Sequence, residues 1–182
     1  MTPLELRGCA ILRRLPQGAR MAEVGVLRGA LSAFVLDRLP GLHLVMVDNW
    51  LTVDQQPESY RATRDDHALH ADAARVARHK ADALAVARRF PGRATLVHDW
   101  SVAAAGAFPG GHFDLVFLDA DHPEEGVRAD IAAWLPKVRP GGWIGGHDYG
   151  NNDPKFDFSG VRRAVDAWVK YPEIDANFTW WV

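Results

Sequence analysis

The sequence predicts a doubly wound α/β fold, in which one mostly parallel sheet carries helices on both faces and ends in an antiparallel C-terminal strand. Two observations support this fold. Short, nearly unbroken apolar runs alternate along the chain with segments whose apolar residues recur at helical spacing. The chain also has 182 residues, 48% of them hydrophobic and 24% charged, which is the composition of one globular domain. We therefore expect residues 1–182 to form a single Rossmann-like domain.

The N-terminal segment, residues 1–18, is expected to form the first helix. Thr2, Pro3 and Glu5 make a capping box with proline at the first helical position, and the turn at residues 16–18 closes the helix. Later apolar runs too short for helices predict strands, and apolar stripes at helical spacing predict helices. These elements are strands at 21–26, 42–47, 94–97, 112–118, 143–146 and 178–182, and helices at 31–39, 69–90, 127–135 and 161–169.

Two connections are long and polar, at residues 50–64 and 150–158. Long loops in compact domains are commonly lids or disordered segments. We expect these two to act as lids over a shared site, with Tyr149, Phe156 and Phe158 facing a bound small molecule. The alternative is that these aromatic side chains pack the sheet edge or a subunit interface.

Charge and cysteine content argue against several classes of function. Lys and Arg total 21 against 23 Asp and Glu, so no basic excess is present to bind a nucleic-acid backbone. The single cysteine, Cys9, rules out an intrachain disulfide framework, and no apolar run approaches the roughly 20 residues that span a membrane. We expect a cytoplasmic protein without nucleic-acid or membrane partners, and its seven tryptophans favour a homodimer.

Carboxylates, histidines and glycines stand at the ends of the predicted strands. Because the carboxyl ends of parallel strands meet at one edge of the sheet, where ligands bind, these residues are candidates for one site. They are Glu23, Gly25 and Gly29 around the first strand, Asp48 and Asn49 after the second, Asp99, Trp100 and Ser101 after the third, Asp119, Asp121 and His122 after the fourth, and His147 and Asp148 after the fifth.

Several of these residues have a purely structural explanation as well. Gly25 lets the backbone approach a ligand closely, or it only forms a turn. Asp48 has the position of a carboxylate that accepts hydrogen bonds from both hydroxyls of a ribose, or it is an ordinary loop aspartate. Asp99 and Ser101 bond the edge of an adenine beside Trp100, or they cap the next helix.

Four segments together resemble the class I S-adenosylmethionine-dependent methyltransferases, over about residues 20–170. They are EVGVLRG at 23–29, the aspartate at 48, FLDADH at 117–122 and PGGWIGGHDY at 140–149. The chain is similar to small bacterial members whose fourth strand ends in D-x-D-H and whose fifth ends in G-H-D-Y. The resemblance implies a cofactor site with Glu23, Gly25 and Gly29 at the methionine, Asp48 at the ribose, Asp99 and Trp100 at the adenine, and Asn49, Ser101 and Asp119 beside them.

The resemblance extends to the metal-dependent sugar O-methyltransferases that act on macrolide antibiotics and, more loosely, to catechol O-methyltransferase. In those enzymes an aspartate ending strand four and an acidic pair ending strand five hold magnesium, and a histidine three residues after the first aspartate is the base. Asp119, Asp148 and His122 match these positions, whereas His147 stands where those enzymes carry a carboxylate. The set Asp119, His147 and Asp148 therefore suits Mn²⁺, Fe²⁺ or Zn²⁺ at least as well as Mg²⁺.

The expected function is transfer of a methyl group from S-adenosylmethionine to a hydroxyl of a small-molecule acceptor, an activity of the EC 2.1.1 type. A hydroxyl must lose its proton during the transfer, and His122 is the base by position, with His147 second. Either histidine could instead be a hydrogen-bonded structural residue. Two other functions stay open: a nonenzymatic S-adenosylmethionine-binding module, and a nicotinamide-dependent oxidoreductase, although the G-x-G-x-x-G fingerprint that it needs is missing.

Overall fold

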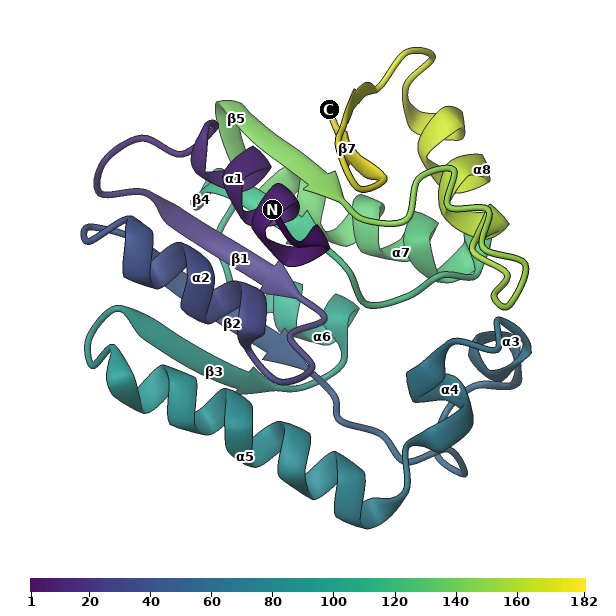
Figure 1. Cartoon of the computed structure of the whole chain (residues 1–182). Coiled ribbons are helices and arrows are strands. Elements are labelled where there is room, and N and C mark those ends of the chain that lie inside the picture. Colours follow the sequence, from purple (N-terminus) through teal and green to yellow (C-terminus); the bar gives the residue numbers. More distant parts are fainter.

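Seven strands form one sheet in the order β3-β2-β1-β4-β5-β7-β6, and the computed structural model describes residues 1–182 (Figure 1). The pairs from β3 through β5 are parallel, whereas β7 runs antiparallel to β5 and β6 antiparallel to β7. This confirms the predicted fold class. The strands are β1 (Arg20–Val24), β2 (His43–Asp48), β3 (Ala94–His98), β4 (Phe113–Leu118), β5 (Val138–Gly146), β6 (Glu173–Asp175) and β7 (Thr179–Trp181).

Helices cover both faces of the sheet, as expected. On one face lie α1 (Pro3–Leu12), α2 (Ala30–Arg38) and α5 (Ala73–Arg89), and on the other α6 (Ser101–Gly106), α7 (Glu124–Trp134) and α8 (Ser159–Trp168). A short 3-10 helix, η1 (Leu135–Lys137), leads into β5. Two further helices, α3 (Glu58–Ala62) and α4 (Asp66–His70), lie beyond the strand ends, outside both layers (Figure 1). None of the helices has the length and apolar content needed to cross a lipid bilayer.

The alternation of side chains along the strands divides the interior into two apolar cores. On β4, Leu115 and Phe117 pack toward α1, α2 and α5, whereas Val116 and Leu118 pack toward α6, α7 and α8. All four side chains are buried. Because both faces of the central strands are covered, these strands appear in the sequence as nearly continuous apolar runs, interrupted by Glu23 on β1 and Asp114 on β4.

Two helix boundaries differ from the predicted ones. The first helix ends at Leu12 and not at residues 16–18, because the N–H of Arg14 bonds three residues back and tightens the chain into a turn. The helix expected at 69–90 is interrupted after His70. There the side chain of Asp72 accepts a hydrogen bond from the N–H of Arg75 at 2.7 Å and begins α5 anew.

The adjacent tryptophans near the C-terminus belong to the core. Trp180 and Trp181 are each 1% exposed, and the ring centroid of Trp181 lies 5.8 Å from that of Phe117. These two side chains stabilise the fold of a single chain, so they give no support to the expected homodimer, which stays a prediction.

The first helix is tied to the far edge of the sheet. The guanidinium of Arg14 lies 4.3 Å from the ring centroid of Trp181 and 5.0 Å from that of Trp143. Its Nη1 donates to Oδ2 of Asp175 at 2.9 Å, and Arg13 pairs with the same carboxylate at 2.8 Å. Through these contacts α1 is attached to β5, β6 and β7.

Candidate active site

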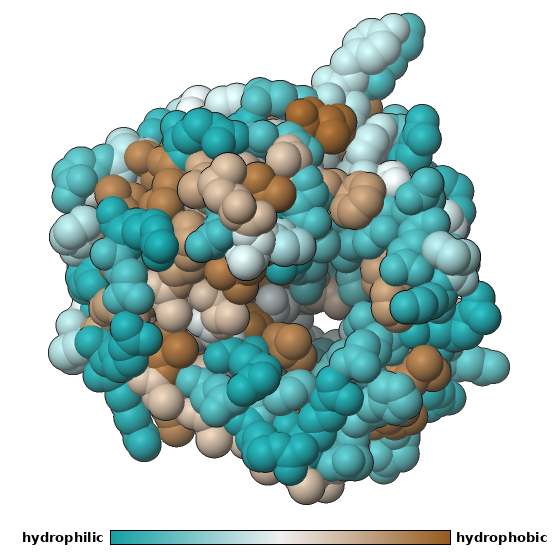
Figure 2. Space-filling model, viewed as in Figure 1, coloured by the Kyte–Doolittle hydropathy of each residue, from teal (hydrophilic) through white to brown (hydrophobic).

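A cavity of about 590 Å³ lies at the carboxyl ends of the parallel strands, and the space-filling view is hollowed there (Figure 2). It sits where the strand order reverses between β1 and β4, which is the usual ligand position in an open α/β sheet. Apart from Gly29, every candidate residue at a strand end lines it: Glu23, Gly25, Asp48, Asn49, Asp99, Trp100, Ser101, Asp119, Asp121, His122, His147 and Asp148.

The two predicted glycines have different roles. Gly25 lines the cavity with a φ of +90°, and a Cβ added to it would lie 2.1 Å from the carbonyl oxygen of Asp119. Gly29 begins α2 with a φ of +78°, and an added Cβ would lie 3.2 Å from Cγ2 of Val86 on α5. Gly25 therefore brings the β1–α2 turn against the end of β4, whereas Gly29 lets α2 pack closely on α5.

Glu23 is a buried carboxyl at the base of the cavity. The hydroxyl of Ser32 donates to its Oε2 at 2.5 Å. Burial raises the pKa of Glu23 to about 8, against the lowering effects of the Ser32 hydrogen bond and of the Arg7 charge. Glu23 is therefore mostly protonated at pH 7 and becomes charged when a cation approaches it.

Asp48 is held by the backbone at the end of β2. Its Oδ2 accepts a hydrogen bond from the N–H of Leu27, and its Oδ1 accepts one from the N–H of Trp50, both at 2.8 Å. A carboxylate has about four acceptor positions, so each oxygen keeps a free position. The arrangement fixes a carboxylate that can receive two neighbouring hydroxyls.

At the end of β3, Trp100 is 51% exposed and lines the cavity beside Asp99. Ser101 does not cap α6, because its hydroxyl donates to Asp130 on α7 and accepts from Nε1 of Trp134 at 2.9 Å. Burial raises the pKa of Asp130 to about 7, although the hydrogen bond from Ser101 opposes the rise. The flat indole and these polar groups form a surface that suits a heterocyclic base.

The two histidines of the predicted site share one carboxylate. Nε2 of His122 lies 3.1 Å from Oδ2 of Asp148, and Nδ1 of His147 lies 3.0 Å from the same oxygen. The side-chain amide of Asn151 donates to Oδ1 of Asp148 at 2.7 Å. Asp148 also has a φ of +62°, a conformation uncommon outside glycine, at the point where β5 leads into the loop.

These contacts shift the three pKa values in opposite directions. Burial alone would lower the pKa of both histidines, but the neighbouring carboxylates have the larger effect. They raise the pKa of His147 to about 9, and they raise the pKa of His122 above its ordinary value. Burial would raise the pKa of Asp148, but the hydrogen bonds from His122 and His147 hold it well below its ordinary value. Asp148 is therefore a permanent anion at neutral pH.

His122 keeps one ring nitrogen free. Its Nδ1 is buried and has no hydrogen-bond partner, and the same holds for Nε2 of His147. The His122 ring lies between two aromatic side chains, with its centroid 6.0 Å from that of Tyr60 and 4.3 Å from that of Phe158. The free nitrogen of His122 thus belongs to a ring of fixed position in the cavity wall.

A candidate metal set overlaps with the predicted one. Ligand atoms of Asp119, His122 and Asp148 lie within 4.8 Å of one another, and Nδ1 of His147 lies close to the same two carboxylates, so either histidine has the position of a third ligand. One nitrogen and two carboxylates are donors that fit a divalent ion. Asp119 already has two cationic neighbours, however: Nη1 of Arg7 at 3.3 Å and Nδ1 of His147 at 3.6 Å.

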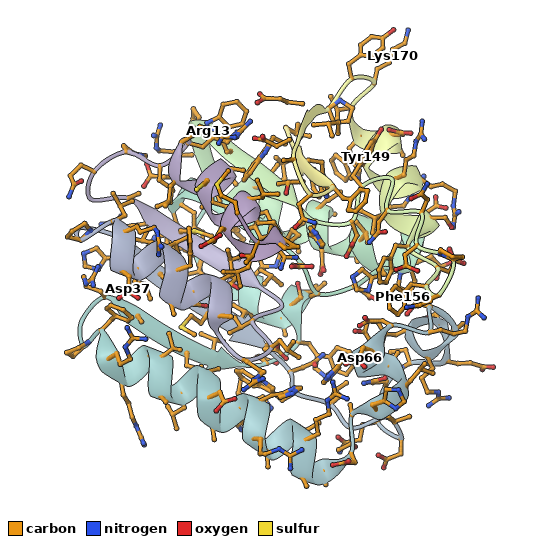
Figure 3. The ribbon with its side chains drawn as sticks, viewed as in Figure 1. Arg13, Asp37, Asp66, Tyr149, Phe156 and Lys170 are labelled. Carbon is orange, nitrogen blue, oxygen red and sulfur yellow. The ribbon has the colours of Figure 1, made fainter.

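The two segments predicted as lids meet over the cavity. The N–H of Asp157 donates to the carbonyl oxygen of Thr63 at 2.8 Å, and residues 50–64 include the short helix α3. Figure 3 shows Phe156 near α3 and α4, and Tyr149 beside α8. Phe156 lines the cavity, but Tyr149 does not, because its hydroxyl donates to Asp166 on α8 at 2.7 Å.

Several polar residues of the cavity wall were not predicted from the sequence, among them Arg7 on α1, Asp130 on α7 and Asn151 in the loop after β5. None of them stands at a strand end. Arg7 follows Leu4, which also lines the cavity, by one helical turn, and this spacing is the only signal that the sequence holds for it.

Comparison with known proteins agrees with this architecture. A candidate caffeoyl-CoA O-methyltransferase from Staphylococcus aureus is similar with a TM-score of 0.63 at 10% identity, over 98% of this chain and 80% of that one. A protein from Corynebacterium glutamicum gives a TM-score of 0.63 at 15% identity, over 100% and 81%. A SAM-dependent methyltransferase from Thiobacillus denitrificans, in complex with S-adenosyl-L-homocysteine, gives 0.51 at 17%, over 81% and 49%. These similarities concern the fold.

No curated protein matches the sequence. Residues 22–149, however, match the model of a family described as a methyltransferase domain. The matched segment runs from β1 through β5 and contains the strand ends that build the cavity. The chain therefore belongs to the family of methyltransferase domains.

Proposed function

We propose that this protein transfers the methyl group of S-adenosylmethionine to a hydroxyl of a small-molecule acceptor, with His122 as the base. The observation that carries the proposal is the pairing of His122 with Asp148 at 3.1 Å inside a cavity whose other end presents Asp48 and Trp100. Family membership supports the methyl transfer, and the geometry of the histidine supports the acceptor class.

The donors and acceptors of the cavity fit the cofactor in type. When bound, S-adenosylmethionine supplies a methyl group on a positively charged sulfur, and carboxylates are the complementary lining for such a ligand. Asp48 offers two fixed oxygens to the ribose hydroxyls, and Trp100 offers a flat face to the adenine. Glu23 offers a carboxyl to the amino group of the methionine, whose positive charge favours ionisation of that carboxyl.

His122 is suited to remove a proton because its two nitrogens differ. A proton on Nε2 is held by Asp148, which leaves the lone pair on Nδ1 free to accept the proton of the acceptor hydroxyl. Asp148 then stabilises the imidazolium that forms, as the buried aspartate does in other acid–base pairs. Tyr60 and Phe158 hold the ring in position and keep water from its faces.

A second arrangement of the same residues is favoured by the close approach of Asp119, His122 and Asp148. In it the three side chains would hold a divalent cation, Mg²⁺ or Mn²⁺, which would supply Lewis-acid assistance to the acceptor hydroxyl. His122 is then a ligand and not the base. The positive charges of Arg7 and His147 next to Asp119 weigh against this arrangement, because a cation would be repelled by both.

The test combines calorimetry with transfer of a radioactive methyl group from S-adenosylmethionine to a panel of sugars, polyols and phenols. His122→Asn should lower transfer by roughly 10²–10⁴-fold, the usual loss for a general base. Its affinity for S-adenosylhomocysteine should stay within about twofold, as should all properties of the control His43→Asn, an exposed residue far from the cavity.

Other outcomes separate the alternatives. Transfer that is abolished by a chelator and restored by Mn²⁺ would favour the metal arrangement. Binding without transfer to any acceptor would favour the nonenzymatic binding module. Failure of the wild-type protein to bind S-adenosylmethionine or S-adenosylhomocysteine would refute the proposed function.

A further inference from the structure

Arg7 places a cation inside a cavity whose charged side chains are mainly carboxylates. The acidic residues of the wall are Glu23, Asp48, Asp65, Asp99, Asp119, Asp121, Asp130 and Asp148. The other arginine of the wall, Arg28, has an exposed side chain paired with Asp82 at 2.8 Å. The side chain of Arg7, by contrast, is 19% exposed and reaches in from α1.

Most of the hydrogen-bonding capacity of Arg7 is unused. Its Nη1 lies 3.3 Å from Oδ2 of Asp119, a long contact. Its Nε is buried without a partner, and Nη2 has no hydrogen bond to the protein. A guanidinium has five N–H donors in a planar fork that matches a carboxylate, and a buried donor without a partner costs free energy. The free donors point to an anionic ligand group.

The neighbours of Arg7 define the kind of anion. Asp119 is in contact with the guanidinium, and the charges of both Arg7 and Asp119 act on the buried carboxyl of Glu23. A simple anion would be repelled by the charge of Asp119. A ligand group that carries an ammonium and a carboxylate on one carbon would be complemented on both sides, because Asp119 faces the ammonium and Arg7 faces the carboxylate.

We propose that Arg7 binds the α-carboxylate of the methionine portion of S-adenosylmethionine, while Glu23 and Asp119 face its α-ammonium. The inference rests on the proposed function and adds to it a cofactor contact from α1. It makes Arg7 a residue that selects ligands carrying the amino acid over shorter adenosine derivatives.

The experiment compares two ligands by calorimetry. S-adenosylhomocysteine contains the amino acid, and 5′-methylthioadenosine contains the same nucleoside without it. Arg7→Met should weaken the binding of S-adenosylhomocysteine by about 10–100-fold, the usual effect of losing a charged hydrogen-bonded pair. The affinity for 5′-methylthioadenosine should stay within about twofold of the wild-type value. Arg88→Met is the control, because Arg88 is an exposed arginine on α5 outside the cavity wall, and it should change neither affinity.

A test on the unmodified protein guards against misfolding of the variant. The carboxamide of S-adenosylhomocysteine lacks the negative charge, and it should bind the wild-type protein as weakly as S-adenosylhomocysteine binds Arg7→Met. Arg7→Lys should recover part of the affinity, because the charge returns without the fork.

Three results would overturn the inference. The first is an equal loss of affinity for S-adenosylhomocysteine and 5′-methylthioadenosine in Arg7→Met. The second is an unchanged affinity of that variant for S-adenosylhomocysteine. The third is equal affinity of the wild-type protein for S-adenosylhomocysteine and its carboxamide. Failure of the wild-type protein to bind S-adenosylhomocysteine and 5′-methylthioadenosine alike would instead refute the proposed function itself.

Discussion

The Cα of Gly25 faces the carbonyl oxygen of Asp119 so closely that an added Cβ would lie 2.1 Å from it. Gly25→Ala should therefore destabilise the protein by about 3 kcal/mol or more, from the steric conflict together with the strain of a φ of +90°. Gly92→Ala is the matched control, since its φ is +75° with no atom within 4 Å of the added Cβ, and it should cost only about 1–2 kcal/mol. Urea denaturation of both variants measures the difference, and equal losses would contradict the assigned close approach.

Asp48 should contribute to the binding of every ligand that contains the ribose. In Asp48→Asn the amide can accept only one of the two N–H groups that the carboxylate now receives from Leu27 and Trp50. We expect about 10–100-fold weaker binding of both S-adenosylhomocysteine and 5′-methylthioadenosine, in contrast to the selective loss expected for Arg7→Met. A loss confined to one of the two nucleosides, measured by calorimetry, would refute this assignment.

Binding of the cofactor should release a proton near neutral pH. The pKa of Glu23 is about 8 in the free protein, and an ammonium group beside it favours the charged form. The affinity for S-adenosylhomocysteine should therefore rise with pH up to about 8 and then level off. Calorimetry in two buffers of different ionisation enthalpy counts the protons released. Glu23→Gln should abolish the release, and an unchanged proton count in that variant would show that another group titrates.

Asp130 should make the free energy of unfolding depend on pH. Its pKa is about 7 in the folded protein against an ordinary value of 3.8, so between these values the native state binds more protons than the unfolded state. Asp130 should then make the free energy of unfolding fall by up to about 4 kcal/mol as pH rises from about 4 to about 7. Asp130→Asn should remove this contribution, whereas the slope that comes from the raised pKa of Glu23 remains.

The groups near Asp130 are Ser101, which donates to it, and Asp121, whose charge also raises its pKa. Urea denaturation at several pH values measures the slope. Asp82→Asn, at an exposed carboxylate on α5, is the control and should leave the slope unchanged. The same slope in wild type and Asp130→Asn would mean that Asp130 is charged in the folded state.

The strands and their order in the chain were predictable because the central strands are buried on both faces. The run ending at Asp48 contains too few residues for a helix and no polar face, which leaves a buried strand as the only interpretation. The short β6 could not be found in this way, since Glu173 and Asp175 give it no apolar run. The break before α5 depends on one hydrogen bond from the N–H of Arg75 to the side chain of Asp72, which helical spacing does not reveal.

The site was predictable where strand ends carry it. Asp48, Asp119 and His122 follow apolar runs, so the rule that strand ends converge was enough to group them. Arg7 could not be grouped with them, because only the packing of α1 brings it to the cavity. The metal set also depended on the fold, because only the folded chain brings a ligand atom of His122 within 4.8 Å of Asp119 and Asp148.

The attachment of α1 through Arg13 and Arg14 has a consequence for ligand exchange. One wall of the cavity is fastened to the sheet, whereas the α3–α4 segment and the 150–158 loop join through the hydrogen bond from Asp157 to Thr63. We expect nucleosides to enter and leave between these two segments. The rate of product release would then depend on how fast the two segments separate, while the N-terminal helix keeps its position throughout the catalytic cycle.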